Sequence, residues 1–485
     1  MTSRRAFLWT AAAMASAAVS APGSLHASTH ASAGAKRGRR VLFQPTPDRL
    51  RQGLFEGAEV NAAHDGITLA KGPGGSHRPA GSFLSQPIEV KGMPSLRLSW
   101  RERWTTPLAW EKHPSNPILG PPPTGNWDAG SLTTPSLLRA GDQFRLYYGS
   151  RPRGSKTAVG MATAPLSDPH RWKKHPKPVL TAGAPGAFDE NGVIGPEVVP
   201  VTGTHWHMYY VGYHPTAKQG RMPVHQIGLA ESDDGGLTWR HSSNEAVVPH
   251  GPAGSYDAFS ASSCSVLRVG KQWMMWYGGI AQVPYLASVC LATSEDGHAW
   301  KKFERNPVLS FNPYLEAEAF LAAAPHVLHE DGLFKMWYSA KGYGEGRKAG
   351  DYRICYAESR DGILWDRFPK NPVVGPSAAG WDSQMAEYPE VLNVDGEHHM
   401  WYCGDGYGSL GYAKGRPLAR VRIQTRAGNA KSPDASWSGW SDPYPDPTGS
   451  EVKHETAAFL QIRARLETED HDFSPAVQDI SLTTA

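Results

Sequence analysis

Apolar and polar residues alternate in short runs along much of the chain, and three kinds of run recur five times in a fixed order. The first kind ends on an aromatic residue: 144–148, 206–210, 273–277, 334–338 and 398–402. The second ends on a small residue, an apolar residue and alanine: 160–162, 228–230, 290–292, 355–357 and 411–413. The third begins at a tryptophan: Trp110, Trp172, Trp239, Trp300 and Trp365. These runs are typical of short strands, so each repeat predicts one small sheet.

The spacing of the repeats predicts how these sheets are arranged. Successive tryptophans of the third kind are 62, 67, 61 and 65 residues apart. A period of roughly sixty residues with about four strands is typical of a β-propeller blade, so the repeats predict a five-bladed propeller at residues 108–415. The Trp110 run precedes the first complete unit, and the last unit stops at Ala413. We therefore expect residues 108–119 to close the ring as the outer strand of the fifth blade, with Leu108 beside Pro417.

The segments on either side of the propeller each resemble half of a β-sandwich. Alternating runs lie at 67–69, 83–85, 88–90 and 96–100 before it, and at 421–423, 460–466 and 480–482 after it. Neither half has enough strands for two packed sheets. We predict an all-β chain whose five-bladed β-propeller is inserted in a discontinuous accessory β-sandwich, formed by residues 41–107 and 416–485. The alternative is two small independent appendages.

The N-terminal residues have the pattern of an export signal. Ser3-Arg4-Arg5-Ala6-Phe7-Leu8 leads into an apolar, alanine-rich run that ends near Ala21, followed by small residues at 31–35. We interpret residues 1–35 as a twin-arginine signal peptide and expect a periplasmic or extracellular protein. A membrane-spanning helix fails on length, and no later run reaches about 18 consecutive apolar residues.

Composition and charge exclude several kinds of partner. The chain has 49 basic and 46 acidic residues among 485, which leaves no strong field for nucleic acid. Its 4 cysteines are too few for a dense disulfide framework. His205 and His207 alternate on one strand face but have no third ligand at convincing spacing, so we predict no metal site. Neither a glycine-rich phosphate loop nor a hydrolase elbow is present, so we expect no cofactor, and we expect a monomer.

A conserved type of turn accompanies three of the repeats. Residues 232–239 fit the S-x-D-x-G-x-T-W pattern of an Asp-box, and 294–300 and 359–365 are shortened versions. Because these boxes recur at the blade period, we interpret them as tight turns whose tryptophan packs between sheets. The resemblance to sialidases stops at the box, since those enzymes use more blades and an arginine triad that we do not find here.

Acidic residues recur near the start of each predicted inner strand. An acid stands seven positions before the residue that begins that strand: Asp128, Asp189, Asp257, Glu318 and Asp382. Inner strands surround a propeller's axis, so these carboxyl groups could converge on a pocket, and glycosidic cleavage needs an acid and a base or nucleophile. A structural turn cap in every blade is the alternative. Glu387 breaks the repeat, because the other blades carry Thr, Ile, Ser or Ala at its position.

The repeats and motifs together resemble a known superfamily. Asn116-Pro117-Ile118-Leu119, Asn306-Pro307-Val308-Leu309 and Lys335-Met336-Trp337-Tyr338 look like those of the five-bladed glycoside hydrolases of families 43, 32, 62 and 130, over about residues 108–415. The resemblance implies an acidic trio at the inner-strand entrances, with a general acid two residues before a proline. Glu387-Tyr388-Pro389 matches that pattern, but in the fifth blade rather than the third. Thr134-Pro135 stands where the family's Asp-Pro base motif is expected.

These observations give a set of expected site residues. We expect Glu387 to be the acid, with Asp128, Asp189 or Glu318 as base and charge modulator. The loops between the middle strands are rich in basic residues and tyrosines, which favours an anionic sugar, although solvated loop charge also explains them. The expected substrate-binding residues are Arg151, Arg221, Tyr343, Asp405 and Tyr407.

The resulting functional hypothesis is an exported glycosidase acting on an oligo- or polysaccharide. Two alternatives stay open at this stage. One is a propeller that binds carbohydrate without catalysis. The other is a polysaccharide lyase, which would need a Tyr or His base and a cation beside a uronate.

Overall fold

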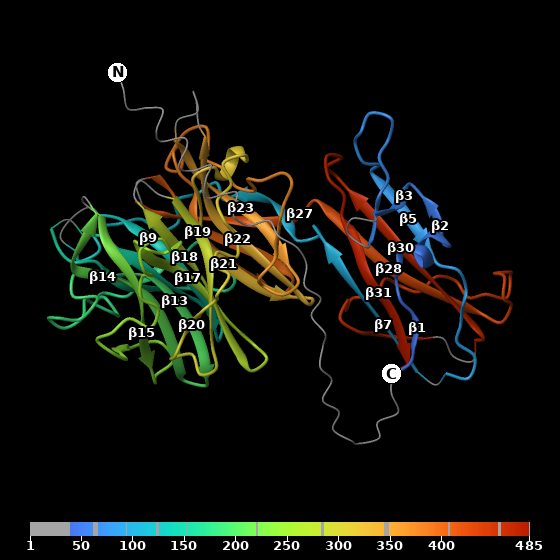
Figure 1. Cartoon of the computed structure of the whole chain (residues 1–485), viewed down its shortest axis with the longest axis horizontal. Helices are drawn as coiled ribbons and strands as arrows, with labels where there is room; N and C mark the ends of the chain where they lie inside the picture. Colours follow the sequence, from blue (N-terminus) through green and yellow to red (C-terminus); the bar gives the residue numbers. More distant parts are fainter. Residues whose placement is uncertain are drawn as a thin grey trace. The chain divides into compact units, whose positions relative to one another are not determined.

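The computed structural model describes residues 39–484, except 62–65, 94, 123–125, 153, 220–221, 283–285, 344–348, 406–407 and 454–456, and except the side chains of 215–219, 222, 349 and 350. The predicted signal peptide at 1–35 lies outside the described residues. Strands form most of the described chain, as Figure 1 shows. Its helical segments are α2 (Pro47–Arg51) and the 3₁₀ turn η1 (Glu316–Glu318). Neither of these described helical segments has the length and hydropathy needed to cross a bilayer.

Within the described residues the propeller has five blades of four antiparallel strands, and a single parallel pairing of Ala287 with Leu321 joins the third and fourth blades into one eight-stranded sheet. The first blade contains β9 (Leu132–Ala140), β10 (Gln143–Ser150), β11 (Ala158–Pro165) and β12 (Lys173–Lys174). The second contains β13 (Val193–Thr202), β14 (His205–Gln219), β15 (Met222–Ser232) and β16 (Arg240–His241). The third contains β17 (Ser260–Val269), β18 (Gln272–Gln282), β19 (Leu286–Ser294) and β20 (Lys301–Lys302). The fourth contains β21 (Leu321–Glu330), β22 (Leu333–Tyr343), β23 (Ala349–Ser359) and β24 (Trp365–Arg367).

The fifth blade closes the ring with a strand from before the propeller. It contains β25 (Glu387–Val394), β26 (Glu397–Cys403), β27 (Leu410–Pro417) and β8 (Pro107–Lys112). Strand β8 pairs antiparallel with β27, so the prediction that the N-terminal segment supplies the missing outer strand is confirmed. The register sets Pro107 opposite Pro417, one residue from the expected Leu108. Pairing the first and last strands covers the edge that β27 would otherwise leave unpaired.

The accessory sandwich is built from strands of both flanks. One sheet contains β29 (Ser450–Val452), β7 (Leu96–Arg103), β31 (Ala476–Thr484), β4 (Gly66–Leu69), β3 (Ala58–Asn61) and, on β31, β1 (Val41–Phe43). The other contains β2 (Leu54–Glu56), β5 (Ala80–Leu84), β30 (Phe459–Thr468), β28 (Ala419–Gly428) and, on β30, β6 (Ile88–Glu89). One apolar core joins the two flanks, with Leu98 and Phe83 packed in the same cluster as Ile462 and Leu482. The five-bladed propeller is therefore inserted in a discontinuous sandwich.

Each inner strand begins with one residue in the left-handed backbone region. These residues are Thr134, Gly195, Ser263, Ala324 and Tyr388, with φ of 48°, 60°, 32°, 46° and 54°. In every blade the pairing of the inner strand with its neighbour is interrupted at this residue. Such a bulge bends the strand and changes the direction of the adjacent side chains. The five bulges bring five short segments to the propeller axis.

A belt of side-chain hydrogen bonds ties each inner strand to the next, two residues after the bulge. Four of its acceptors receive backbone N–H groups: Ser136 from Val198 at 3.1 Å, Glu197 from Val266 at 2.8 Å, Ser265 from Val327 at 3.0 Å and Glu390 from Leu137 at 2.7 Å. In the fourth blade the equivalent residue is His326, whose Nδ1 lies 2.8 Å from Oε2 of Glu390 in the next inner strand. Because the four N–H groups are buried, each of these four hydrogen bonds satisfies a group that would otherwise be costly.

Candidate functional site

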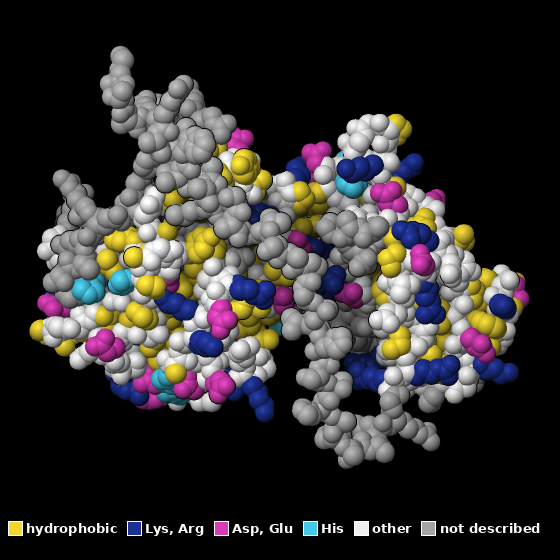
Figure 2. Space-filling model, in the orientation of Figure 1, with side chains coloured by type: hydrophobic (Ala, Val, Ile, Leu, Met, Phe, Trp, Pro, Cys, Tyr) yellow, Lys and Arg dark blue, Asp and Glu magenta, His cyan; other side chains and the backbone are white. Residues whose placement is uncertain are grey.

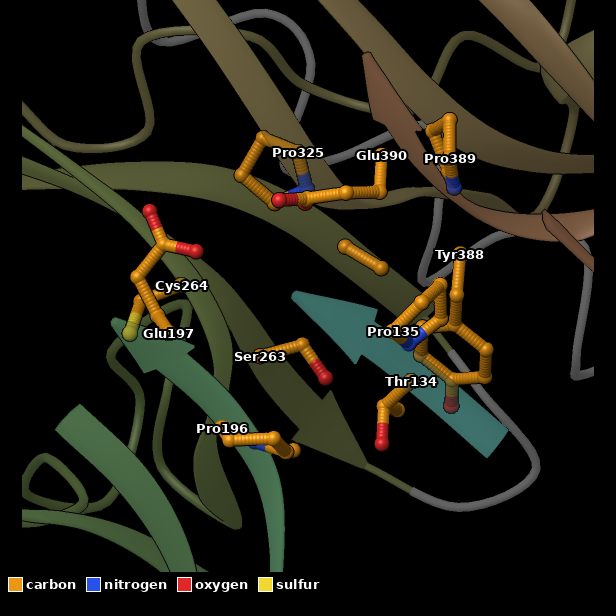
Figure 3. A pocket seen from close by; sticks show the side chains of 12 residues that line it. Thr134, Pro135, Pro196, Glu197, Ser263, Cys264, Pro325, Tyr388, Pro389 and Glu390 are labelled. Carbon is orange, nitrogen blue, oxygen red and sulfur yellow. The ribbon is translucent and has the colours of Figure 1, made fainter. Parts of the chain in front are cut away.

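A cavity of about 200 Å³ lies at the entrances of the inner strands. Its polar lining comes from all five blades: Arg151 after β10, His225 in β15, Ser262 in β17, Tyr352 in β23 and Glu387 at the start of β25. A second, narrower cavity of about 30 Å³ is lined by the five bulge residues together with Glu197 and Glu390. Figure 3 shows this narrow cavity, with Thr134, Ser263 and Tyr388 around it. The two cavities share Ser263, Ala324 and Tyr388, so they form one axial site.

Glu387 is the carboxyl group of the larger cavity. It is buried, with 4% of its surface exposed, and among the described residues it is the one acid that lines this cavity. Its position is fixed from both sides, because it pairs with Cys403 across the sheet and the next residue, Tyr388, donates its backbone N–H to the Ser339 hydroxyl at 2.9 Å. The structure therefore places Glu387, one of the acids that break the repeat, at the axis.

Arg151 gives the cavity its positive charge, because the other basic side chain in its lining, His225, is neutral. Burial, with a smaller contribution from the Arg151 guanidinium, lowers the pKa of His225 to about 3, so this imidazole is neutral at physiological pH. Its Nδ1 lies 3.1 Å from the Ser262 hydroxyl, and its ring stacks on Tyr213 with centroids 4.9 Å apart. Arg151 is accordingly the cation among the described residues that line the cavity.

The five repeated acids are held away from the axis by a common arrangement. Each carboxyl group accepts a hydrogen bond from a tyrosine of the second strand and contacts a basic side chain of the outer strand. The tyrosine distances are 3.3 Å for Asp128–Tyr148, 2.8 Å for Asp189–Tyr210, 2.9 Å for Asp257–Tyr277, 3.2 Å for Glu318–Tyr338 and 2.9 Å for Asp382–Tyr402. The basic contacts are Asp128–Lys174 at 2.7 Å, Asp189–His241 at 3.1 Å, Asp257–Lys302 at 2.5 Å, Glu318–Arg367 at 3.0 Å and Asp382–Lys112 at 2.7 Å.

This arrangement corrects the expected catalytic set. Asp128, Asp189 and Glu318 line neither axial cavity, so the structure does not bring them together with Glu387. The physical reason is that the segment before each inner strand directs its acid toward the second and outer strands, where a cation neutralises the buried charge. The alternative to a catalytic role, in which each blade repeats the acid because it stabilises that blade, explains why these residues are present.

The expected substrate-binding residues divide in the same way. Arg151 lines the larger cavity, whereas Arg221 and Tyr407 lie outside the residues whose side chains are described. Tyr343 packs edge-on against Phe320, with ring centroids 5.1 Å apart. Asp405 accepts hydrogen bonds from the Ser383 hydroxyl at 3.0 Å and the Gln384 backbone at 2.7 Å. Neither Tyr343 nor Asp405 lines a described axial cavity, because each is engaged within its own blade.

Three lining residues were missed by the sequence analysis. His225 and Tyr352 stand just after the basic loops, at the beginnings of third strands, and Ser262 occupies in blade three the position of Glu387 in blade five. Aligning the starts of the third strands, as well as the inner strands, would have singled out His225 and Tyr352, because both sets of ends face the same rim.

Comparison with known proteins shows the family. Residues 195–416 match the model of the glycosyl hydrolases family 32 N-terminal domain. The uncharacterized protein Rv1502 of Mycobacterium tuberculosis is 30% identical over 316 residues, which cover 63% of this chain and 98% of that protein. The chain belongs to the five-bladed β-propeller glycoside hydrolase superfamily. The expected resemblance is therefore confirmed.

Other members of this superfamily extend the comparison. A 1,2-beta-oligomannan phosphorylase of Thermoanaerobacter sp. is 33% identical over 111 residues, 22% of this chain and 36% of that protein. A glycosyl hydrolase structure from Bacteroides ovatus aligns with a TM-score of 0.53 at 14% identity, over 65% of this chain and 96% of that one. A structure from the GH130 family of mannoside phosphorylases aligns with a TM-score of 0.51 at 15% identity, over 71% of this chain and 98% of that one. At these identities the two structures show that this chain shares their fold.

Proposed function

We propose that this protein is a carbohydrate-active enzyme that cleaves a glycosidic bond in the axial cavity, with Glu387 as the proton donor to the leaving oxygen. The observation that carries the proposal is the position of Glu387: a buried carboxyl group in a 200 Å³ cavity on the axis of a glycoside hydrolase propeller. Cleavage of a glycosidic bond needs a carboxyl group beside the leaving oxygen, and Glu387 supplies it.

The base motif of the family is missing from this chain, and this affects which nucleophile can attack the anomeric carbon. Thr134-Pro135 stands in its place, and the described residues of the larger cavity supply no second carboxyl group. Hydrolysis ordinarily uses a second carboxylate, either to activate water or to attack the sugar. A substrate that brings its own anionic nucleophile does not need that second group.

Phosphorolysis is therefore the second candidate, and Arg151 favours it. A guanidinium in the cavity can bind inorganic phosphate through two parallel hydrogen bonds. In this reaction a phosphate oxygen forms a bond to the anomeric carbon, the glycosidic C–O bond breaks, and the Glu387 proton passes to the leaving oxygen. The partial similarity to a 1,2-beta-oligomannan phosphorylase supports testing β-1,2-linked mannosides first. Arg151 could equally bind the carboxylate or sulfate of an anionic sugar.

A panel of neutral and acidic oligosaccharides, incubated with and without inorganic phosphate, tests both candidates. We expect products that disappear in Glu387→Gln. A sugar phosphate formed only with phosphate present, and a rise of about tenfold or more in the KM for phosphate in Arg151→Met, would support phosphorolysis. Arg139→Met is the matched control, since Arg139 lies in the same blade and is about half exposed. Free sugar formed at the same rate without phosphate would support hydrolysis instead.

Two other results would contradict cleavage by Glu387. Tight binding of an oligosaccharide without turnover would identify a non-catalytic binding propeller. An unsaturated product that absorbs in the ultraviolet would identify a lyase, for which the cavity offers Tyr352 and His225 beside Arg151.

We also propose export by the twin-arginine route. The support is the Ser3-Arg4-Arg5-Ala6-Phe7-Leu8 segment and the alanine-rich run that follows it. Cell fractionation of the full chain should recover a shortened protein outside the cytoplasmic membrane, and Arg4→Lys/Arg5→Lys should retain it inside. Equal export of this variant and the wild type would contradict the proposal.

A further inference from the structure

Three histidines and one glutamate converge on the outside of blade two. His205 and His207 lie on β14, Glu231 lies opposite His207 on β15, and His298 comes from the turn between β19 and β20 of the neighbouring blade. The Nε2 atoms of the three histidines lie 4.0, 3.9 and 3.2 Å from Glu231 Oε1. The ligand atoms of His205, His207 and Glu231 all lie within 4.8 Å of one another. The sequence offered no third ligand for the histidine pair, whereas the fold supplies one from β15 and another from the next blade.

The hydrogen bonds of His205 and His207 fix which nitrogen carries the proton. His205 Nδ1 lies 2.7 Å from Asp233 Oδ1, and His298 Nδ1 lies 3.1 Å from the carbonyl oxygen of Asp296. Asp233 Oδ1 only accepts, so His205 Nδ1 donates, whereas His298 faces an acceptor on both sides, because its Nε2 also hydrogen-bonds to Glu231 Oε1 at 3.2 Å. His207 Nδ1 lies 3.3 Å from the hydroxyl of Tyr209. That hydroxyl donates its own hydrogen bond to the carbonyl oxygen of Gly297 at 2.7 Å. The Tyr209 oxygen therefore accepts from His207 Nδ1.

The consequence is that the Nε2 atoms of His205 and His207 present lone pairs toward one carboxylate oxygen, while His298 Nε2 hydrogen-bonds to that oxygen and would release its proton on binding a metal ion. His207 is the most telling of them, because it is 1% exposed and its buried Nε2 has no hydrogen-bond partner among the described residues. Arg240 does not supply that partner, since its contacts are with the other oxygen of Glu231, at 3.4 Å, and with Asp233.

We propose that His205, His207, His298 and Glu231 bind a divalent transition-metal ion of the zinc class. Neutral imidazoles and a carboxylate oxygen are ligands that zinc prefers, and bonds of about 2.0–2.1 Å in a tetrahedron separate neighbouring ligand atoms by about 3.4 Å. The observed separations of 3.2 to 4.0 Å from Glu231 bracket that value. Asp233 completes the arrangement as the carboxylate that orients a metal-binding histidine.

The ion would stabilise the ring and take no part in the axial chemistry. His298 and the other ligands belong to different blades, so one ion would join blade two to blade three. On β15, His225 lines the cavity, whereas Glu231 stands six residues further along, which is about 20 Å in an extended strand. Figure 2 shows histidine beside acidic and basic side chains at the lower margin of the propeller, where a dissolved ion can reach the surface.

Metal content and calorimetry test this site without any activity assay. The purified protein is stripped with a chelator, dialysed and titrated with Zn²⁺, and its thermal midpoint is recorded with and without the ion. We expect one equivalent bound, a higher thermal midpoint, and a cobalt derivative with the visible spectrum of tetrahedral Co²⁺. Binding without stoichiometry, or no binding, would overturn the proposal.

Variants distinguish this site from adventitious binding. His207→Ala should weaken zinc affinity by at least about 100-fold, and Asp233→Asn by about 10–100-fold because it only orients His205. If His207→Ala does not fold, His298→Ala replaces it as the test variant, because His298 is half exposed and its loss should disturb the fold less. His175→Ala, an exposed histidine of blade one, is the control and should bind as the wild type does. Equal zinc affinity in His298→Ala and in the wild type would exclude the proposed site.

Discussion

At the scale of single residues, the buried acids of the propeller differ in what their carboxyl groups contact. Asp128 meets a tyrosine hydroxyl and the Lys174 ammonium, and the same contacts recur in the other blades. Glu387 instead faces a cavity shared by five blades. A buried carboxylate is tolerated when a cation and a hydrogen-bond donor neutralise it. The repeated acids are thus explained by stability, whereas Glu387 lies where it can reach a substrate in the cavity.

Removing the cation of one repeated pair should destabilise the fold and spare the site. We expect Lys174→Met to lower the free energy of unfolding by about 2–3 kcal/mol, because Asp128 stays buried without its partner and Lys174 is only a quarter exposed. Denaturant unfolding measures the loss, and the exposed neighbour Lys173→Met is the control. In the folded fraction, turnover should be unchanged. If Lys174→Met lost turnover while its free energy of unfolding stayed at the wild-type value, Asp128 would have to be considered a catalytic residue.

The sequence could locate these acids but not assign their roles. Asp128 was found from its spacing to Pro135, yet Lys174, which decides its role, stands 46 residues later in the outer strand. Spacing along the chain does not report where a side chain points after a turn. Glu387 was predictable for the opposite reason, since it breaks the repeat and precedes Pro389 by two residues. His207 shows the same limit, because its partner His298 lies in another blade.

The belt around the axis contains a carboxyl group that holds its proton. Burial, followed by the charge of Glu390, raises the pKa of Glu197 to about 8. Near this group lie His326, which contacts Glu390 at 2.8 Å, and the thiol of Cys264, whose own pKa is raised chiefly by burial. Glu197 is therefore protonated at neutral pH and shares the narrow cavity with Glu390.

This raised pKa predicts how stability depends on pH. An unfolded glutamate has a pKa of about 4.3, so between about pH 4.3 and pH 8 the folded state binds more protons at this site than the unfolded state does. The site therefore makes the free energy of unfolding fall as pH rises through this window, by at most about 1.4 kcal/mol per pH unit. Glu197→Gln should flatten that fall, measured by urea unfolding from pH 5.5 to 8. Parallel pH profiles for this variant, the wild type and the exposed control Glu304→Gln would contradict it.

At the scale of elements, the Asp-boxes are turns stabilised by one carboxylate each. Asp234 accepts the backbone N–H groups of Leu237 and Thr238, both at 3.0 Å, and the Thr238 hydroxyl at 2.6 Å. The tryptophan of the same box packs edge-on against Tyr147 of the preceding blade, with centroids 5.8 Å apart. These contacts confirm the structural interpretation of the box and give no sign of a binding role.

Loss of one such carboxylate should destabilise its blade by a modest amount. Despite some burial, these hydrogen bonds hold the pKa of Asp234 at about 2, below its ordinary value. Its stabilisation is therefore present above about pH 4 and is lost as pH falls toward 2. Asp234→Ala should lower the free energy of unfolding by about 1–3 kcal/mol at pH 7. Glu245→Ala, an exposed acid of the same blade, should have no effect, and a larger loss at pH 3 than at pH 7 would refute this explanation.

Strands were more predictable than the bulges between them. The runs ending on aromatic residues lie inside β10, β14, β18, β22 and β26, which are buried for most of their described length. The left-handed residues were not predicted, since Thr134, Ser263, Ala324 and Tyr388 carry side chains that rarely adopt positive φ. Closure of the propeller imposes that backbone conformation, and the pattern of residues in the sequence does not indicate it.

At the scale of the whole molecule, the same chain segment closes the propeller and connects it to the sandwich. Strand β8 follows β7 of the sandwich and supplies Lys112, the cation that neutralises Asp382 of the fifth blade. Next to this crossing, Arg103 of β7 contacts Glu358 and Asp366 of the fourth blade, each at 2.9 Å. Glu358 is fully buried, so this contact is a specific joint between the sandwich strand and the propeller.

The repeat made the overall fold predictable, whereas the extent of each part stays a prediction. Five tryptophans at a constant period, with one segment displaced to the front, were sufficient to infer a ring closed by β8. The boundaries at 107–108 and 415–416 follow from that inference, and we propose them as the limits of the inserted propeller. The chemistry was less predictable, because the lining of the axial site comes from separate segments of all five blades.

The most direct test of Glu387 as the acid compares two leaving groups. An aryl glycoside with a good leaving group needs no proton at the departing oxygen, whereas an ordinary glycoside does. Once a cleaved sugar is known, kcat/KM of wild type and Glu387→Gln is measured on both. We predict a loss of about 10²–10⁴-fold on the ordinary glycoside and a much smaller loss on the activated one. Equal losses on the two substrates, in a variant that remains folded, would show that Glu387 does not donate the proton.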